Sequence, residues 1–205
     1  MSETAGAHAP AKDAEGARIG MWLFLFTEFL LFGGLFILYS AYRARYPGDF
    51  DRSGKELNHA IGVANTAVLL TSSLTAALSV AALERRDRRK CLLFLAGTIL
   101  LGAAFLGNKY VEWSGEIRHG IYPNSPELLE RPPGEILFYG LYFSMTGLHG
   151  LHVAAGLAVL AVLWVLVRRE PDPERNLTRL ENAALYWHLV DVIWIFLLPL
   201  FYLAA

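Results

Sequence analysis

Two pairs of residues with metal-binding side chains occur at one-turn spacing in this sequence. His149 and His152 are separated by two residues, and so are His188 and Asp191. In an α-helix this spacing puts both side chains of a pair on one face. Imidazole and carboxylate groups that converge from several helices are the ligands of dinuclear metal sites in helical bundles. The first chemistry to consider is therefore a metal centre shared by the two pairs.

Other charged groups stand in strongly apolar surroundings. Glu28 lies in the segment WLFLFTEFLLF, and Lys109 and Glu112 lie three residues apart in another apolar region. A central acidic residue in a membrane span costs roughly 2.5–3.5 kcal/mol, so such groups usually face protein or water. For Lys109 and Glu112 we expect a local ion pair. For Glu28 two interpretations stay open: a protonated carboxyl bonded within the bundle, or a group that titrates or contacts a partner subunit or lipid headgroup.

The elements that carry these residues are predicted to be membrane-spanning helices. The chain has 205 residues, 55% of them hydrophobic, and the apolar residues gather into long runs. Crossing a hydrocarbon core of ~30 Å takes about 20 residues, and backbone groups in lipid must pair internally. We therefore predict an all-α polytopic membrane protein, a five-transmembrane-helix bundle. A polar segment 1–18 precedes a membrane domain 19–205 with spans 19–42, 60–83, 91–113, 136–167 and 183–203.

Composition and motifs exclude several classes of protein. The single cysteine, Cys91, rules out an internal disulfide and a thiolate metal cluster. No Gly-rich phosphate loop, nucleophile motif or basic nucleic-acid patch occurs in the sequence. The second span is rich in small and hydroxyl residues, and the fourth carries Gly147, Gly150 and Gly156. Such residues let membrane helices approach closely, so we expect tight helix crossings at both spans.

The distribution of basic residues predicts the orientation of the bundle. The N-terminal segment and the two connections on its side of the membrane carry eleven Lys and Arg residues, against six on the other side. This bias places the N-terminus in the cytoplasm and the C-terminus outside. Arg168 and Arg169, at the end of the fourth span, enforce this topology and are candidates to hold an anionic lipid phosphate.

The depth of each polar group can be calculated from the predicted spans and a rise of 1.5 Å per residue. Glu28 then lies roughly 14 Å, Asp191 roughly 12 Å and His188 roughly 8 Å from the cytoplasmic end. His152 lies roughly 22 Å from that end and His149 higher still, because the fourth span runs the other way. Metal ligands must lie within about 2 Å of one ion. This arithmetic disfavours a metal centre and predicts a polar layer that Glu28 shares with His188 and Asp191.

Three interpretations of the histidine positions remain after this calculation. The sequence favours histidines that bond to neighbouring backbone or hydroxyl groups within the helix packing. A proton-linked or lipid-linked role is the second interpretation, and a metal centre is the least favoured. A transporter typically shows a broken helix or an inverted repeat, and five spans without a repeat argue against one.

The polar stretches as a group resemble subunit III of the haem-copper respiratory oxidases. This family contains cytochrome c oxidase subunit III and the matching quinol oxidase subunit. The matching stretches are Thr27-Glu28, Asn65-Thr66 with the following LLTSSLT, TGLHGLHVAAG at 146–156 and YWHLVDVIWIF at 186–196. The similarity covers residues 19–203 and is closest to the short form of the family, without two extra N-terminal helices. Those helices line a lipid cleft in the seven-span form, so here another subunit must complete the cleft or it is absent.

The resemblance implies a role for the chain and for individual residues. It implies a non-catalytic subunit of a proton-pumping terminal oxidase that reduces dioxygen to water in the bacterial inner (plasma) membrane. Haem and copper would lie in partner subunits and none in this chain. Subunit I would be the main contact, with subunit II, further respiratory complexes and phospholipids as other partners, and no nucleic acid. The family's intramembrane polar positions fall on Glu28, Glu112, His149, His152, His188 and Asp191.

Some points depart from the family pattern or stay open. Lys109 stands where many members have an uncharged residue. The electron donor is cytochrome c or quinol, and the sequence does not choose between them. Alternatives to the oxidase are an accessory subunit of a nitric oxide reductase, and a free-standing membrane transporter or metal enzyme.

Overall fold

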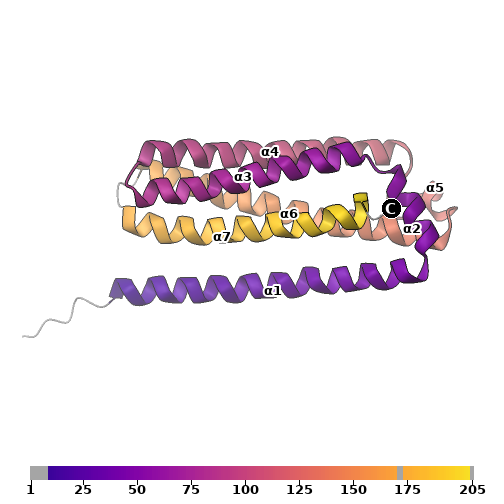
Figure 1. The fold of residues 1–205 in the computed structure, drawn as a ribbon, viewed down its shortest axis with the longest axis horizontal. Coiled ribbons are helices and arrows are strands. Elements are labelled where there is room, and N and C mark those ends of the chain that lie inside the picture. The colour runs from indigo at the N-terminus through magenta and orange to yellow at the C-terminus, as the bar shows by residue number, and fades with distance from the viewer. Residues whose placement is uncertain (1–8, 170–172, 204–205) are drawn as a thin grey trace, which may run out of the picture.

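Five long helices form the body of the structure (Figure 1). The computed structural model describes residues 9–169 and 173–203, with side chains within 15–169 and 176–203. The long helices are α1 (Ala9–Arg45), α3 (His59–Glu84), α4 (Arg88–Arg118), α6 (Pro133–Arg169) and α7 (Pro173–Leu198). All five are long and apolar enough to cross a membrane, and the described residues contain no strand. The prediction of an all-α bundle of five transmembrane helices is confirmed.

The long helices extend beyond the spans expected from hydropathy. The difference is largest at α7, which begins at Pro173, whereas the expected span begins at Ala183. Polar residues such as Arg179 and Asn182 therefore belong to the helix and not to the preceding connection. The helix α1 likewise begins at Ala9, inside the expected polar segment 1–18. Residues 1–8, 170–172 and 204–205 lie outside the described residues.

Side-chain caps fix where two of the helices begin. The Asn58 side chain accepts a hydrogen bond of 3.2 Å from the backbone N–H of Ile61 at the start of α3. Asp87 accepts a bond of 3.1 Å from the N–H of Lys90 at the start of α4. Asn and Asp stabilise helix N-termini because they satisfy backbone donors that have no intrahelical partner. The turn between α3 and α4 is closed by Arg86, whose φ is +60°.

Two short helices cover the end of the bundle opposite the α3–α4 turn. They are α2 (Pro47–Glu56) and α5 (Pro126–Leu129), in the segments between the predicted spans. The Arg131 guanidinium bridges Glu56 at 2.9 Å and Glu135 at 3.2 Å. This bridge ties α2 to the beginning of α6. Phe50 of α2 is buried, so the segment is packed and not a free surface loop.

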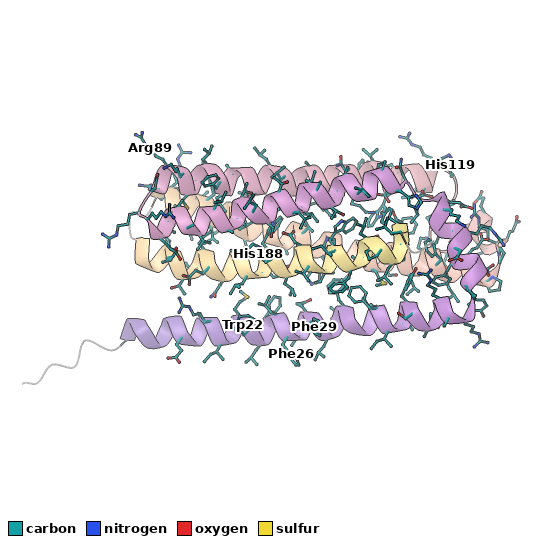
Figure 2. All side chains as sticks on the ribbon, viewed as in Figure 1. Trp22, Phe26, Phe29, Arg89, His119 and His188 are labelled. Atoms are coloured by element: carbon teal, nitrogen blue, oxygen red, sulfur yellow. The ribbon has the colours of Figure 1, made fainter. Side chains whose placement is uncertain are left out.

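The helix α7 lies at the centre of the bundle, and α1 lies at its edge (Figure 1). Half of the most apolar window of α7 is buried, against 11% for α1. Trp22, Phe26 and Phe29 lie along α1 (Figure 2), each with 60% or more of its surface exposed. In a chain of membrane-spanning helices, such a face meets lipid or another protein.

Glycines allow α4 and α6 to approach the Trp187 ring of α7. A Cβ atom on Gly102 would lie 2.7 Å from the Trp187 ring, and a Cβ atom on Gly156 would lie 2.9 Å from it. Trp187 is fully buried and donates a 3.0 Å hydrogen bond to the Ser72 hydroxyl of α3. The close crossing expected at Gly156 is therefore present. The crossing needs glycine because the bulky indole of Trp187 on α7 fills the space that a side chain at Gly102 or Gly156 would take.

Candidate functional site

Glu28 and His152 form a close pair between α1 and α6. The carboxyl Oε2 and the imidazole Nε2 are 2.9 Å apart, and the two side chains are 13% and 14% exposed. The other imidazole nitrogen, Nδ1, lies 2.7 Å from the carbonyl oxygen of Leu148. The edge of the Phe32 ring packs on the imidazole at 5.4 Å between centroids. A largely buried carboxyl and imidazole therefore meet between two membrane-spanning helices.

The proton inventory of this pair follows from its partners. A carbonyl oxygen accepts only, so Nδ1 of His152 must carry a hydrogen in order to bond Leu148. Nε2 then has two states: it is unprotonated and faces the O–H of a neutral Glu28 carboxyl, or it is protonated and faces a Glu28 carboxylate. The two states differ only in the position of one proton. In both states the proton lies between the same two side chains, which are 2.9 Å apart.

The contact between Glu28 and His152 overturns the expected polar layer. The depth calculation placed His152 about 8 Å from the level of Glu28 and grouped Glu28 with His188 and Asp191. That calculation counted Glu28 from Ile19 and His152 from Val167, whereas α1 begins at Ala9 and α6 ends at Arg169. The predicted span ends are therefore not fixed levels, and an offset of roughly five or six residues accounts for a difference of about 8 Å. His152 therefore lies beside Glu28 and not above it.

His188 and Asp191 face α3 and not α1. The Ser73 hydroxyl lies 2.5 Å from Nδ1 of His188, as expected for a histidine that bonds to a neighbouring hydroxyl. Ser73 also lies beside the Asp191 carboxyl, which is only 3% exposed. Neither Asp191 oxygen completes a hydrogen bond with a described group. A carboxyl in this state is much less costly when it is protonated than when it is charged.

His149 is enclosed by aromatic rings. It is fully buried between Phe105, at 5.5 Å, and Trp194, at 5.2 Å between ring centroids. Neither of its nitrogens has a hydrogen-bond partner among the described residues. The expected bond from this histidine to backbone or hydroxyl is therefore absent there, and its ring serves as packing against Phe105 and Trp194.

The four positions that suggested a metal centre thus point in different directions. His152 faces α1, His188 and Asp191 face α3, and His149 lies among rings from α4 and α7. Across the described part of the chain, no three His, Cys, Asp or Glu side chains gather as metal ligands. Different helix faces, and not different depths, keep these groups apart.

A second polar cluster surrounds Lys109 and Glu112 of α4. The ion pair expected between them is confirmed, with Nζ and Oε2 3.2 Å apart and both side chains at least 93% buried. Lys109 donates hydrogen bonds to the hydroxyls of Tyr142 (3.1 Å) and Tyr202 (2.9 Å). Both hydroxyls in turn donate to Glu112 Oε1, Tyr142 at 2.5 Å. Each tyrosine hydroxyl therefore accepts from the lysine and donates to the glutamate.

Sequence analysis missed the two tyrosines of this cluster. Tyr202 lies in a π-helical turn, Pro199–Leu203, that follows α7 and directs the ring toward α4. The ammonium of Lys109 also lies within 6 Å of the ring centroids of Trp113 and Trp194. A buried Tyr hydroxyl normally needs a polar partner, so tyrosines inside apolar spans were the available signal.

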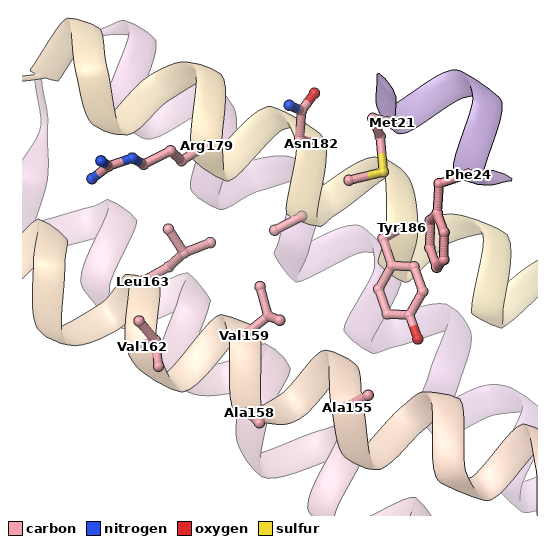
Figure 3. A pocket seen from close by; sticks show the side chains of 11 residues that line it. Met21, Phe24, Ala155, Ala158, Val159, Val162, Leu163, Arg179, Asn182 and Tyr186 are labelled. Carbon is pink, nitrogen blue, oxygen red and sulfur yellow. The ribbon is translucent and has the colours of Figure 1, made fainter. Parts of the chain in front are cut away.

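A largely apolar groove runs between α1, α6 and α7 (Figure 3). Its volume is about 680 Å³, and its wall includes Phe24, Val159 and Tyr186. Arg179 of α7 lies near one end of the groove, and Asn182 lies further along the same helix toward Tyr186. The lipid-headgroup candidates Arg168 and Arg169 are exposed at the end of α6 and do not line it. Arg179, one of the eleven basic residues counted for the predicted orientation, is the cation at this groove.

Comparison with known proteins gives a match over the whole chain. The family model for cytochrome c oxidase subunit III matches residues 1–205. Subunit 3 of the cytochrome bo(3) ubiquinol oxidase of Pseudomonas aeruginosa is 32% identical over 198 residues, covering 96% of this chain and 89% of that protein. Cytochrome c oxidase subunit 3 of Bacillus sp. (strain PS3) is 33% identical over 205 residues, covering 95% and 91%. A probable quinol oxidase subunit 3 of Staphylococcus haemolyticus is 28% identical, covering 91% and 88%.

Proposed function

Because this chain belongs to the cytochrome c oxidase subunit III family, we propose that it is the non-redox subunit III of a proton-pumping haem-copper terminal oxidase. The complex would reduce dioxygen to water with electrons from cytochrome c or quinol, the donors named in its relatives. The observation that carries this proposal is similarity over nearly the full length of both chains. The chain would stabilise the catalytic subunit and support proton uptake.

We assign the haem and copper of the complex to subunit I and the other partners. Haem and copper would need histidine or other donor atoms within about 2 Å of the metal. In the described bundle, His152 faces Glu28, His188 faces Ser73 and His149 is enclosed by aromatic rings, so their arrangement does not fit either group. Subunit I is the proposed main partner, with subunit II and further respiratory complexes as additional ones.

The proposed location is the bacterial inner membrane, with the N-terminus in the cytoplasm and the C-terminus outside. The support is the excess of Lys and Arg on the side that carries the α3–α4 turn. In this arrangement residues 19–205 form one membrane domain. The Arg168–Arg169 end of α6 then lies at the cytoplasmic surface, and α2 and α5 at the outer surface.

The groove between α1, α6 and α7 supports a lipid-binding role for this five-helix form. Its apolar wall fits an acyl chain, and Arg179 offers a cation for the phosphate (Figure 3). The groove is lined within this one chain, so it does not depend on two additional helices. A phospholipid held here would cover the space between α1 and the rest of the bundle.

Purification of the chain tests the proposed function directly. In mild detergent, a tagged form of the chain is expected to copurify with haem-containing partners that consume dioxygen. Haem absorbance spectra and an oxygen electrode make the two measurements, with untagged membranes as the control. If the chain is isolated without haem, the oxidase proposal fails. Consumption of nitric oxide without dioxygen reduction would favour the nitric oxide reductase alternative instead.

Replacing Glu28 by glutamine tests the proton-linked role of its pair with His152. Glutamine keeps the shape but cannot exchange a proton, so we expect normal haem content and reduced sustained turnover or proton pumping. Turnover over many cycles and proton release from vesicles are the measurements. Glu15→Gln is the matched control, because Glu15 is exposed on the same helix. Unchanged turnover, pumping and subunit association would show that Glu28 is a packing residue only.

A further inference from the structure

The turn between α3 and α4 concentrates positive charge at one end of the bundle. Five cations occupy six successive positions: Arg85, Arg86, Arg88, Arg89 and Lys90. Two acidic residues, Glu84 and Asp87, stand among them. The turn joins two membrane-spanning helices, so these side chains lie where the hydrocarbon core ends.

Only part of this charge is used within the protein. Lys90 pairs with Asp87 at 2.9 Å, and its hydrogen bond to the carboxylate is the main cause that lowers the pKa of Asp87. Asp87 therefore stays ionised at neutral pH and offsets Lys90. Arg88 donates to the backbone carbonyl of Arg168 on α6. Arg85, Arg86 and Arg89 are exposed, and no described group pairs with them; Figure 2 shows Arg89 at the tip of the bundle.

A hollow of about 450 Å³ lies beside the turn, on the surface between α3 and α4. Arg85, Lys90 and the Asp87 carboxylate that pairs with Lys90 line its polar end, and Leu78, Ala81 and Phe94 line its apolar part. Leu78 is seven residues before Arg85, so the hollow extends about 10 Å along the helix toward the membrane interior. Small side chains at Ala81 and Ala82 leave the space open. A second hollow, of about 630 Å³, shares Arg85 and adds Arg86 and Arg89.

We propose that the hollow between α3 and α4 binds an anionic phospholipid. Its phosphate would accept hydrogen bonds from Arg85, with Arg86 and Arg89 adding attraction, because guanidinium groups match phosphate oxygens in geometry and charge. The upper part of one acyl chain would lie on Leu78 and Phe94. Basic pockets between transmembrane helices are known to hold such headgroups.

Two features favour a lipid over a soluble anion. The apolar part of the hollow is lined by residues of the membrane-spanning helices. A free phosphate ion would not cover these apolar side chains, whereas an acyl chain would. The cations stand at one end only, as an amphiphile requires. This site is separate from the groove of α1, α6 and α7, because α3 and α4 lie on the other side of α7 from α1 (Figure 1).

Two variants with opposite expected effects on lipid retention test this proposal. The full chain, purified with the partners it retains, is placed in phosphatidylcholine nanodiscs with a minority of phosphatidylglycerol, and bound lipids are counted by native mass spectrometry. Arg85→Gln should weaken retention of phosphatidylglycerol about fivefold, the effect of one interfacial cation. Asp87→Asn should strengthen it, since Lys90 is released while asparagine still caps α4. Arg118→Gln, at the opposite end of α4, is the matched control and should change nothing.

The outcomes distinguish a lipid site from a general anion site. Equal retention of phosphatidylglycerol by wild type and Arg85→Gln overturns the proposal, as does a loss of retention in Asp87→Asn. Inorganic phosphate is tested alone on lipid-depleted protein. If it binds there as strongly as phosphatidylglycerol does in the nanodiscs, the turn binds anions in general and the lipid assignment is wrong. Ala81→Leu, which fills the apolar part and leaves all charges in place, should also lower lipid retention.

Discussion

Replacing Glu112 by alanine is expected to destabilise the bundle by about 3–5 kcal/mol, because it leaves the buried Lys109 charge without its counterion. The same change removes the acceptor of two tyrosine hydroxyls, Tyr142 and Tyr202. Tyr202 is held by this cluster at the π-helical turn after α7, so the turn should loosen as well. Unfolding of the purified protein in mixed detergent micelles, followed by Trp fluorescence, measures the loss.

The matched comparison for Glu112 removes both charges together. Lys109→Met with Glu112→Leu keeps most of the volume and leaves no unpaired charge, so it should be less harmful than either single change. A double-mutant cycle that compares the two single variants with the double variant gives the interaction free energy between the two residues. Glu130→Ala, an exposed acidic residue, should be close to neutral. A double variant as unstable as Glu112→Ala would mean that the tyrosine hydroxyls, and not Lys109, need the carboxylate.

Replacing Gly102 by alanine is expected to destabilise the centre of the bundle by about 1–3 kcal/mol through overpacking. The added methyl group would lie 2.7 Å from the Trp187 ring and 2.8 Å from Leu157. Trp187 cannot shift freely, because its indole N–H is bonded to Ser72. Leucine at this position should be more severe and should prevent stable association with partner subunits. Thermal unfolding and recovery of the complex are the measurements.

Gly107 provides the control for Gly102 on the same helix. A methyl group at Gly107 meets nothing within 4 Å, so Gly107→Ala should be neutral or slightly stabilising. A second-site change gives an independent check. Trp187→Phe is smaller than the indole, so it should harm the protein alone but offset part of the Gly102→Ala effect. If both glycine changes behave alike, helix propensity and not contact with Trp187 accounts for the result.

The features that sequence analysis predicted correctly depend on local patterns. Long apolar runs with internal backbone pairing leave only helices, which fixes the all-α class and the number of spans. The Lys109–Glu112 ion pair follows from a spacing of three residues on one helix. Gly156 marked a close crossing because only a small residue permits one.

The errors arose where the answer depended on how helices align with each other. The polar residues that precede Ala183 belong to α7, and Arg18 of α1 pairs with Glu181 there at 2.8 Å. Hydropathy alone begins that span too late, because it does not record such contacts between helices. The wrong partner for Glu28 came from the alignment of the fourth span with the first: His152 was placed about 8 Å from the level of Glu28, which it contacts. The helix that each polar residue faces is likewise set by the packing of the helices around α7. Residue spacing within a single sequence does not reveal that packing.

The central position of α7 has a consequence for how the protein is made. The four helices around α7 all precede it in the chain, so they enter the membrane before their common partner is synthesised. During that interval the α3 hydroxyls that later accept from Trp187 and Trp194 have no indole to bind. Ser72 and Thr66 donate instead to carbonyls of their own helix, at 2.8 and 3.0 Å, so α3 can wait in lipid without an unpaired donor. The lone pairs of the two hydroxyl oxygens stay available until α7 inserts. Its two indole N–H groups then donate to them, and the central helix of the bundle is in place.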